Sequence, residues 1–190
     1  MTLRLVRADA VAPQPWRNGG GLTRELLAWP QPDRWQLRIS VADIRRDGPF
    51  SAFDGVDRWF AVLDGAGVRL ALPGGKPQVT ADDEPLRFRG EDAPGCTLLD
   101  GPTRDLNLML RRAAGSGLME RAAAGEPLAP PGRFRALFSA DACTLLRDGA
   151  AALALPAGTL AWTDGGAHGI WRIAAEAPVR AFCIAFEPAP

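Results

Sequence analysis

Six Asp–Gly pairs divide this chain into short segments and constrain its fold more than any other sequence feature. The pairs are Asp47–Gly48, Asp54–Gly55, Asp64–Gly65, Asp100–Gly101, Asp148–Gly149 and Asp164–Gly165. Asp and Gly tolerate the positive φ angles of tight turns, so such a pair between apolar runs predicts a β-hairpin. Between the turns, Trp35, Leu37, Ile39 and Val41 alternate with polar or small residues, which is the period of a half-buried strand. Many short strands at this spacing predict an all-β sandwich or barrel.

The predicted strands fall into two groups. Residues 58–72 predict two strands joined at Asp64–Gly67. Further strands are expected in 85–90, 96–101, 105–112, 134–140, 143–149, 151–158, 159–166, 169–174 and 179–186. Small residues and prolines over 113–133 predict a linker, with a single helical turn around 118–124. The linker separates a first domain, 1–112, with 16 basic and 15 acidic residues, from a smaller β lobe, 134–190; residues 113–190 hold only 6 and 7.

Charge and hydropathy exclude several classes of partner. The chain has 190 residues, with 22 basic and 22 acidic side chains, so its formal net charge is zero. A chain without positive excess is a poor candidate for binding nucleic acid or an anionic membrane surface. No apolar run approaches the ~20 residues that span a bilayer. The first residues lack the apolar segment of a signal peptide, so we expect a cytoplasmic protein.

The cysteines and the histidine argue against a metal or redox site. Cys96, Cys143 and Cys183 are far apart, and two of them lie in apolar runs where a thiol behaves as a small buried hydrophobe. His168 is the single histidine, so no two- or three-histidine metal site can form, and no Ser-His-Asp triad can form without it. We expect His168 in a surface loop, no metal and no cofactor.

The densest cluster of unusual residues runs from Pro15 to Glu25, as PWRNGGGLTRE. Three consecutive glycines cost backbone entropy unless the chain turns sharply or approaches another group closely. No strong strand precedes the cluster and the G-K-[ST] ending is missing, so it is neither a dinucleotide-binding loop nor a P-loop. Two interpretations remain: a loop whose amides and Asn18 face a ligand, or a tight corner between strands.

Together with WQLRIS, GPFSAFDGVDRWFAVLDGAG, FRGEDAP and DGPTRDLNLMLRR, this cluster closely resembles the HutD/Ves family. The resemblance runs in order from about Pro13 to Arg112. It implies an RmlC-like cupin fold, a double-stranded β-helix or jelly roll, with a bicupin-like duplication in one chain. It also implies a link to bacterial histidine utilisation, in which these proteins are thought to be regulatory binders of small molecules.

Metal-binding cupins hold their metal with histidines and a glutamate, and the resemblance locates the matching segments here. Asp57 and Arg58 stand near one expected ligand position, and Ala161 and Trp162 near another. Neither segment contains a histidine. We therefore expect a metal-free pocket.

The strand faces that line the pocket stay open at this point. If Leu37, Ile39 and Val41 pack against a second sheet, Arg38 and Ser40 face solvent; if the polar face is the interior, they line the cavity. Asn107 alternates with aliphatic residues, and a buried amide usually has a specific partner. The expected ligand-binding residues are Trp16, Asn18, Gly20, Thr23, Arg38, Ser40, Asp57, Arg58, Asp105 and Asn107, with Arg38 and Arg58 holding a carboxylate.

The resulting functional expectation is a small-molecule binder of an anionic intermediate of histidine catabolism: urocanate, formiminoglutamate or formylglutamate. The alternative is a metal-independent cupin enzyme, an isomerase or lyase, using Glu25, Asp57 or Asp105 as acid or base. A structural partner protein with an empty barrel is a third class. Among partners we expect a small anionic metabolite, no nucleic acid and no membrane, with a homodimer as the assembly to test.

Overall fold

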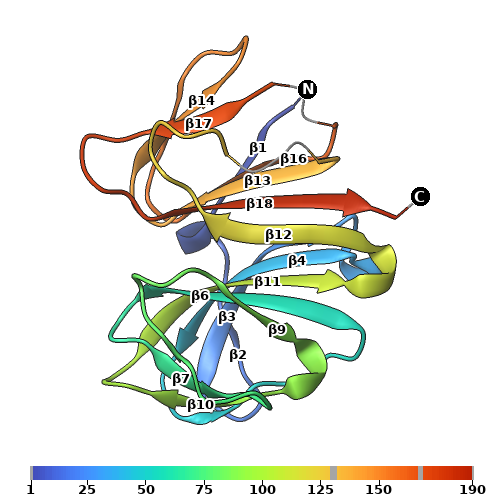
Figure 1. Ribbon diagram of the computed structural model, residues 1–190, viewed down its shortest axis with the longest axis vertical. Helices are drawn as coiled ribbons and strands as arrows, with labels where there is room; N and C mark the ends of the chain where they lie inside the picture. Colours follow the sequence, from blue (N-terminus) through green and yellow to red (C-terminus); the bar gives the residue numbers. More distant parts are fainter. Residues whose placement is uncertain (1, 129–131, 167–168, 190) are drawn as a thin grey trace. The chain divides into compact units, whose positions relative to one another are not determined.

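The computed structural model describes residues 2–128, 132–166 and 169–189, and it confirms the all-β class (Figure 1). These residues form short antiparallel strands and three-residue 3₁₀ turns, without an α-helix among them. No helix in the described ranges is long and apolar enough to cross a membrane. The chain divides into two compact units: unit 1 comprises Met1–Ala10 and Gly115–Pro190, and unit 2 comprises Val11–Ala114.

The expected first domain, 1–112, differs at both of its ends from unit 2, Val11–Ala114. Strand β1 (Arg4–Arg7) pairs with β16 (Thr159–Thr163), so the N-terminal segment belongs to unit 1. The expected linker begins with β12 (Gly115–Arg121), which pairs over its whole length with β18 (Ala181–Pro188) and contains no helical turn. Ladder pairing outweighs the weak strand preference of its small residues, as β-propensity depends on context.

Unit 2 consists of two antiparallel sheets. The larger has the order β2 (Gln14–Pro15), β3 (Gly21–Trp29), β4 (Leu37–Ile44), β11 (Thr103–Arg111), β6 (Val56–Asp64) and β9 (Leu86–Arg89). The smaller has the order β5 (Gly48–Pro49), β10 (Gly95–Leu98), β7 (Val68–Ala71) and β8 (Gln78–Val79). Their core contains Phe60, Val62, Val68, Leu70 and Cys96. The two strands predicted on either side of Asp64–Gly67 are present as β6 and β7. They belong to different sheets and do not pair with each other, so the β-hairpin predicted from this Asp–Gly pair is wrong, and the turn leads from the larger sheet to the smaller one.

The register of the larger sheet brings polar residues from four strands into two transverse rows. In one row, Arg38 of β4 faces Met109 of β11, which faces Arg58 of β6. In the other, Ser40 of β4 faces both Asn107 of β11 and Glu25 of β3. Directly opposed residues share one face of a sheet, so these side chains project to the same side.

Unit 1 repeats the two-sheet arrangement around an apolar interior. Its larger sheet has the order β1, β16, β13 (Phe134–Ser139), β18 and β12; its smaller sheet has the order β15 (Leu153–Leu155), β14 (Cys143–Arg147) and β17 (Trp171–Ala174). Leu137, Leu145, Ile173, Trp171 and Cys183 are buried together in one cluster.

Candidate functional site

Unit 2 encloses a cavity of about 590 Å³ on the polar face of its larger sheet. Its buried floor is formed by Ala42, Ile44, Phe50, Arg58, Phe60, Asn107 and Met109. Its exposed edge is formed by Gln14, Pro15, Arg17 and Asn18 on one segment and by Pro49 and Ser51 on another. The β2–β3 turn and the segment after β5 therefore border the opening.

The cavity settles which face of β4 is inside. Arg38 and Ser40 line it, whereas Leu37 and Ile39 project to the opposite face and are fully buried there. The larger sheet is therefore buried on both faces around its centre. The polar-interior alternative is the one that the structure adopts.

Arg58 is the most unusual side chain of this cavity. It is 5% exposed, and its Nη2 donates to the Asn107 Oδ1 at 3.1 Å. Its Nε and Nη1 have no acceptor among the residues that the structure describes. The guanidinium carbon lies 5.0 Å from the ring centre of Phe50, 5.1 Å from that of Phe88 and 5.7 Å from that of Phe53.

Burial, together with the like charge of Arg38 as the smaller cause, lowers the pKa of Arg58 to about 10. The side chain is still protonated at neutral pH. Aromatic faces attract a cation but satisfy none of its hydrogen bonds. An unpaired buried cation is costly, so an acceptor from outside the chain would stabilise this arrangement.

Arg38 differs from Arg58 because it already has a carboxylate partner. Its Nη2 lies 2.8 Å from the Glu25 Oε2, and its guanidinium lies over the Trp35 ring at 5.4 Å. The pair leaves Arg58 as the buried lining cation without a carboxylate among the described residues.

The glycine-rich cluster is a tight corner between β2 and β3, and it also forms part of the cavity wall. That its residues face a ligand stays a prediction. The Trp16 indole N–H donates to the Thr23 Oγ1 at 2.7 Å, and both residues line the cavity. The Gly20 amide donates to the Asn18 Oδ1 at 2.9 Å. Gly21 passes so close to β4 that a Cβ would lie 2.5 Å from the Asp43 carbonyl oxygen. Gly20 itself is buried and does not line the cavity.

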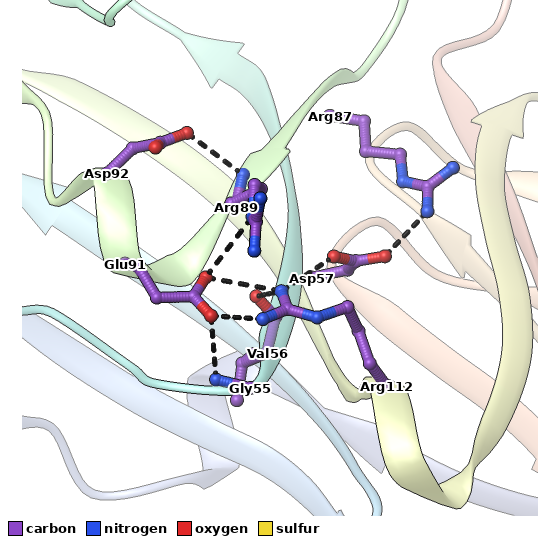
Figure 2. A network of polar contacts seen from close by, with 8 residues as sticks. All are labelled: Gly55, Val56, Asp57, Arg87, Arg89, Glu91, Asp92 and Arg112. Carbon is purple, nitrogen blue, oxygen red and sulfur yellow. Dashed lines mark hydrogen bonds and ion pairs between the residues drawn. The ribbon is translucent and has the colours of Figure 1, made fainter.

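Asp57 was expected at the site but lies outside it. As the neighbour of Arg58 on β6 it projects to the other face, where Arg87 approaches its Oδ2 at 2.5 Å and Arg112 its Oδ1 at 3.1 Å. Figure 2 shows Asp57 between these two arginines, with Arg112 also bonded to Glu91. Burial alone would raise the pKa of Asp57, but the two arginine hydrogen bonds outweigh it and the pKa is lowered.

Asp105 projects to the same face of β11 as Asn107 but does not line the cavity. It is fully buried, accepts a hydrogen bond from the Thr103 hydroxyl at 2.9 Å, and its Oδ1 has no partner among the described residues. Burial holds the pKa of Asp105 well above its usual range and so favours the neutral form of this carboxyl.

The remaining expected residues can be placed directly. Seven of the ten line the cavity: Trp16, Asn18, Thr23, Arg38, Ser40, Arg58 and Asn107. The aromatic residues Phe50, Phe53 and Phe60, together with Arg17 and Met109, line it as well and were not predicted. Phe50 and Phe53 belong to GPFSAF, a segment that the family resemblance had already singled out.

The cavity does not offer the donor set of a metal-binding cupin. Its lining contains one carboxylate, Glu25, and neither histidine nor cysteine, whereas cupin-type transition-metal sites need several such ligands. Within the described ranges, no three His, Cys, Asp or Glu side chains gather as a metal site would require. His168 lies outside the described residues. Burial is the main cause that raises the pKa of the Cys96 thiol to about 12, with smaller contributions from nearby acidic side chains.

Comparison with known proteins identifies the family of this chain. The family model described as HutD matches residues 8–181. The chain belongs to the HutD family. A protein of the Pseudomonas putida hutC 3′ region, itself uncharacterized, is 38% identical over 109 residues, which are 56% of this chain and 57% of that protein. Protein Ves of Citrobacter koseri is 37% identical over 99 residues, 51% of this chain and 52% of that protein. The chain therefore aligns with little more than half the length of each relative.

Two solved structures match this chain over all or nearly all of its length. A protein of unknown function from Pseudomonas aeruginosa is 28% identical, with a TM-score of 0.89 over 98% of this chain and 100% of that one. HutD from Pseudomonas fluorescens is 25% identical, with a TM-score of 0.86 over both complete chains. A salicylate 1,2-dioxygenase, 9% identical with a TM-score of 0.59 over 96% of this chain and 81% of that one, shares the fold alone. The chain has the cupin-like jelly-roll fold that its resemblance to this family implied.

Proposed function

We propose that unit 2 binds a small organic acid, with the carboxylate of the acid next to Arg58 in the cavity. The single observation that supports this most is the state of Arg58: buried, protonated, lining the cavity and without a carboxylate among the described residues. Charge-assisted hydrogen bonds to a carboxylate are roughly twice as strong as neutral ones. A bound acid would therefore satisfy the guanidinium that the chain leaves unpaired.

Unit 1 supports the proposal by contrast. Arg135 of β13 is also buried, but its Nη1 donates to the Gly169 carbonyl oxygen at 2.9 Å and its guanidinium lies over the Trp171 ring at 4.8 Å. A buried arginine in this kind of barrel can thus receive an acceptor from the backbone. Arg58 receives only the Asn107 amide oxygen, which fits a site that awaits an anion.

The ligand class that we propose is the set of acids in histidine catabolism: urocanate, formiminoglutamate or formylglutamate. The support is the family itself, because one relative is described by its place beside hutC and one solved structure is called HutD. Because the lining offers no metal donor set, we propose a metal-free regulatory binder of such an acid in the cytoplasm.

The test is isothermal titration calorimetry with the three acids on Arg58→Ala, Arg58→Lys and a control, Arg87→Ala. Loss of a charged hydrogen-bond partner costs about 1.5–3 kcal/mol, or roughly ten- to more than a hundred-fold in affinity. Lysine should rescue poorly because it lacks the planar fork of arginine. The control removes an arginine that pairs with Asp57 outside the cavity and should bind like the parent. Binding of the Arg58→Ala variant within threefold of the parent would refute the assignment.

A metal-independent enzyme is the second candidate, because Glu25 is a carboxylate in the cavity wall. Of the three acids or bases that the sequence suggested, it is the one that could touch a ligand there. NMR of the candidate acids incubated with the protein would reveal turnover. Turnover that the Glu25→Gln variant loses would favour the enzyme; unchanged spectra together with measured binding would favour the binder.

A further inference from the structure

Three exposed arginines, Arg17, Arg45 and Arg46, lie on or beside the two segments that border the cavity and have no acidic partner among the described residues. Arg17 lines the cavity at its exposed edge. Arg45 and Arg46 are exposed in the connection from β4 to the segment that forms the other edge. Their amides both donate to the Gly20 carbonyl oxygen, at 2.9 Å and 3.2 Å, so this connection is tied to the turn that forms the first edge.

Several other arginines of unit 2 form ion pairs with carboxylates. Arg24 and Arg104 both pair with Asp43, at 2.6 Å and 2.8 Å, and Arg38 pairs with Glu25. Arg17, Arg45 and Arg46 have no such pair with any residue in the described ranges. The nearest acidic neighbour in sequence, Asp47, uses its Oδ1 to accept the Leu98 amide at 2.9 Å.

We infer that Arg17, Arg45 and Arg46 form a basic rim that concentrates anions at the opening and speeds their capture by Arg58. Like charges around a concave opening with low-dielectric walls focus the potential and raise association rates of charged ligands. Such steering acts through the summed charge and needs no direct contact with the ligand. The inference rests on the proposed function for the identity of the anion, but the potential itself can be measured without any organic acid.

Collisional quenching of Trp16 measures that potential at the cavity wall. The variant Arg45→Gln/Arg46→Gln removes two rim charges. The matched control is Arg34→Gln/Arg69→Gln, because both of its arginines are exposed but lie away from the two bordering segments, in the turn Pro32–Arg34 and on β7. Each protein is compared with the same protein carrying Trp16→Phe, and the difference isolates the Trp16 signal. The quenchers are iodide, caesium and neutral acrylamide.

In low salt, the rim variant should lose about half or more of its iodide quenching constant and gain caesium quenching, while the control should not change. Acrylamide quenching should be equal in all proteins, which shows that the fold and the access to Trp16 are intact. The iodide difference should vanish near 1 M salt, where the Debye length is about 3 Å. Equal iodide quenching in the rim variant and the control would overturn the inference.

A second measurement separates the rim from the site. Stopped-flow association of whichever acid binds the parent should be slower in the rim variant, with an unchanged dissociation rate. Changed iodide quenching without any acid binding would refute the proposed function and leave the rim intact. Acid binding that depends on Arg58, with unchanged iodide quenching, would refute the rim and leave the site intact.

Discussion

Arg58 and Asp105 are two ionisable side chains buried in unit 2 of this HutD protein, and burial disfavours the charged form of each. Arg58 stays protonated at neutral pH, with three phenyl rings and one amide around it. Asp105 instead has its pKa held well above the usual range by burial, which favours its neutral form. Of these two side chains, Arg58 is the one that lines the cavity and offers a charge to a ligand.

The raised pKa of Asp105 makes unit 2 less stable as pH rises. The unfolded chain loses this proton above about pH 3.8 and the folded chain keeps it, so stability falls by up to about 1.4 kcal/mol per pH unit until the folded pKa is passed. Asp105→Asn keeps the acceptor for Thr103 and removes the titration. We expect the variant to match the parent near pH 3.8 and to be more stable at pH 7, as measured by urea unfolding at several pH values.

Asp43→Asn is the control with the opposite sign. Burial would raise the pKa of Asp43, but hydrogen bonds from Arg24 and Arg104 outweigh it and the pKa is lowered. Its stabilisation is present above pH 3.8 and is lost as pH falls, so this variant should be less stable than the parent at pH 7. Equal pH profiles for the parent and the Asp105→Asn variant would contradict the buried neutral carboxyl.

At the residue scale, the sequence predicted much of the site, and the errors follow from the period of a strand. Arg58 and Asp57 are neighbours on β6 and cannot both face the cavity, because successive side chains point to opposite faces. Asp105 shares the face of Asn107 but does not line the cavity. Alternation predicts which face of a strand a residue occupies, but not which residues on that face reach the cavity. Phe50 and Phe53 were missed because they precede a strand and show no period.

Among the elements, the turn between β2 and β3 joins the fold to the site most closely. Gly19 has a φ of 68°, in the left-handed region that favours glycine, although a Cβ there would meet no other atom within 4 Å. At Gly21 the constraint is space and not backbone conformation, since a Cβ would lie 2.5 Å from the backbone oxygen of Asp43. At Gly20 the atoms nearest to a Cβ belong to the Asn18 side chain, whose Oδ1 would lie 3.2 Å away.

These distances predict an order of destabilisation within the glycine triplet. Gly21→Ala forces β3 away from β4 and should cost about 1–3 kcal/mol, the usual cost of overpacking. Gly20→Ala should cost less, because the contacting atom ends a movable side chain. Gly74→Ala, in open space, is the control. Denaturant unfolding of the three variants checks the order; a Gly21→Ala variant as stable as the control would contradict the close approach.

The sequence predicted most strands and missed those that lack alternation or depend on distant partners. Strand β3 follows three glycines, and β12 begins with Gly115, Ser116 and Gly117, so local preference favours a turn or linker in both places. Strand β1 pairs with β16, about 155 positions later in the chain. No local pattern reveals such a partner, which is why the expected first domain wrongly included the N-terminal strand.

In the molecule as a whole, the two units share a two-sheet arrangement but differ in what fills their interiors. Unit 1 fills its barrel with Leu137, Leu145, Ile173 and their neighbours, whereas unit 2 holds a cavity with polar walls. Charged residues likewise concentrate before residue 113 in the sequence. The predicted boundary is displaced at the N-terminus, because β1 precedes unit 2 in the chain but pairs with β16 of unit 1.

The complete chain should also carry no stoichiometric transition metal. The cavity lining has one carboxylate and no histidine or cysteine, which is too few donors for such an ion. Elemental analysis of the purified protein is the measurement. About one iron, zinc or nickel per chain would contradict this expectation, whichever residues held the metal.

The most direct test of the central claim is a crystal structure of this protein grown with whichever of the three acids shows affinity in calorimetry. We predict density for the acid inside the cavity of unit 2, with its carboxylate within about 3 Å of the Arg58 guanidinium, the distance of a charge-assisted hydrogen bond. An acid that binds in solution but occupies another place, with Arg58 untouched, would contradict the claim.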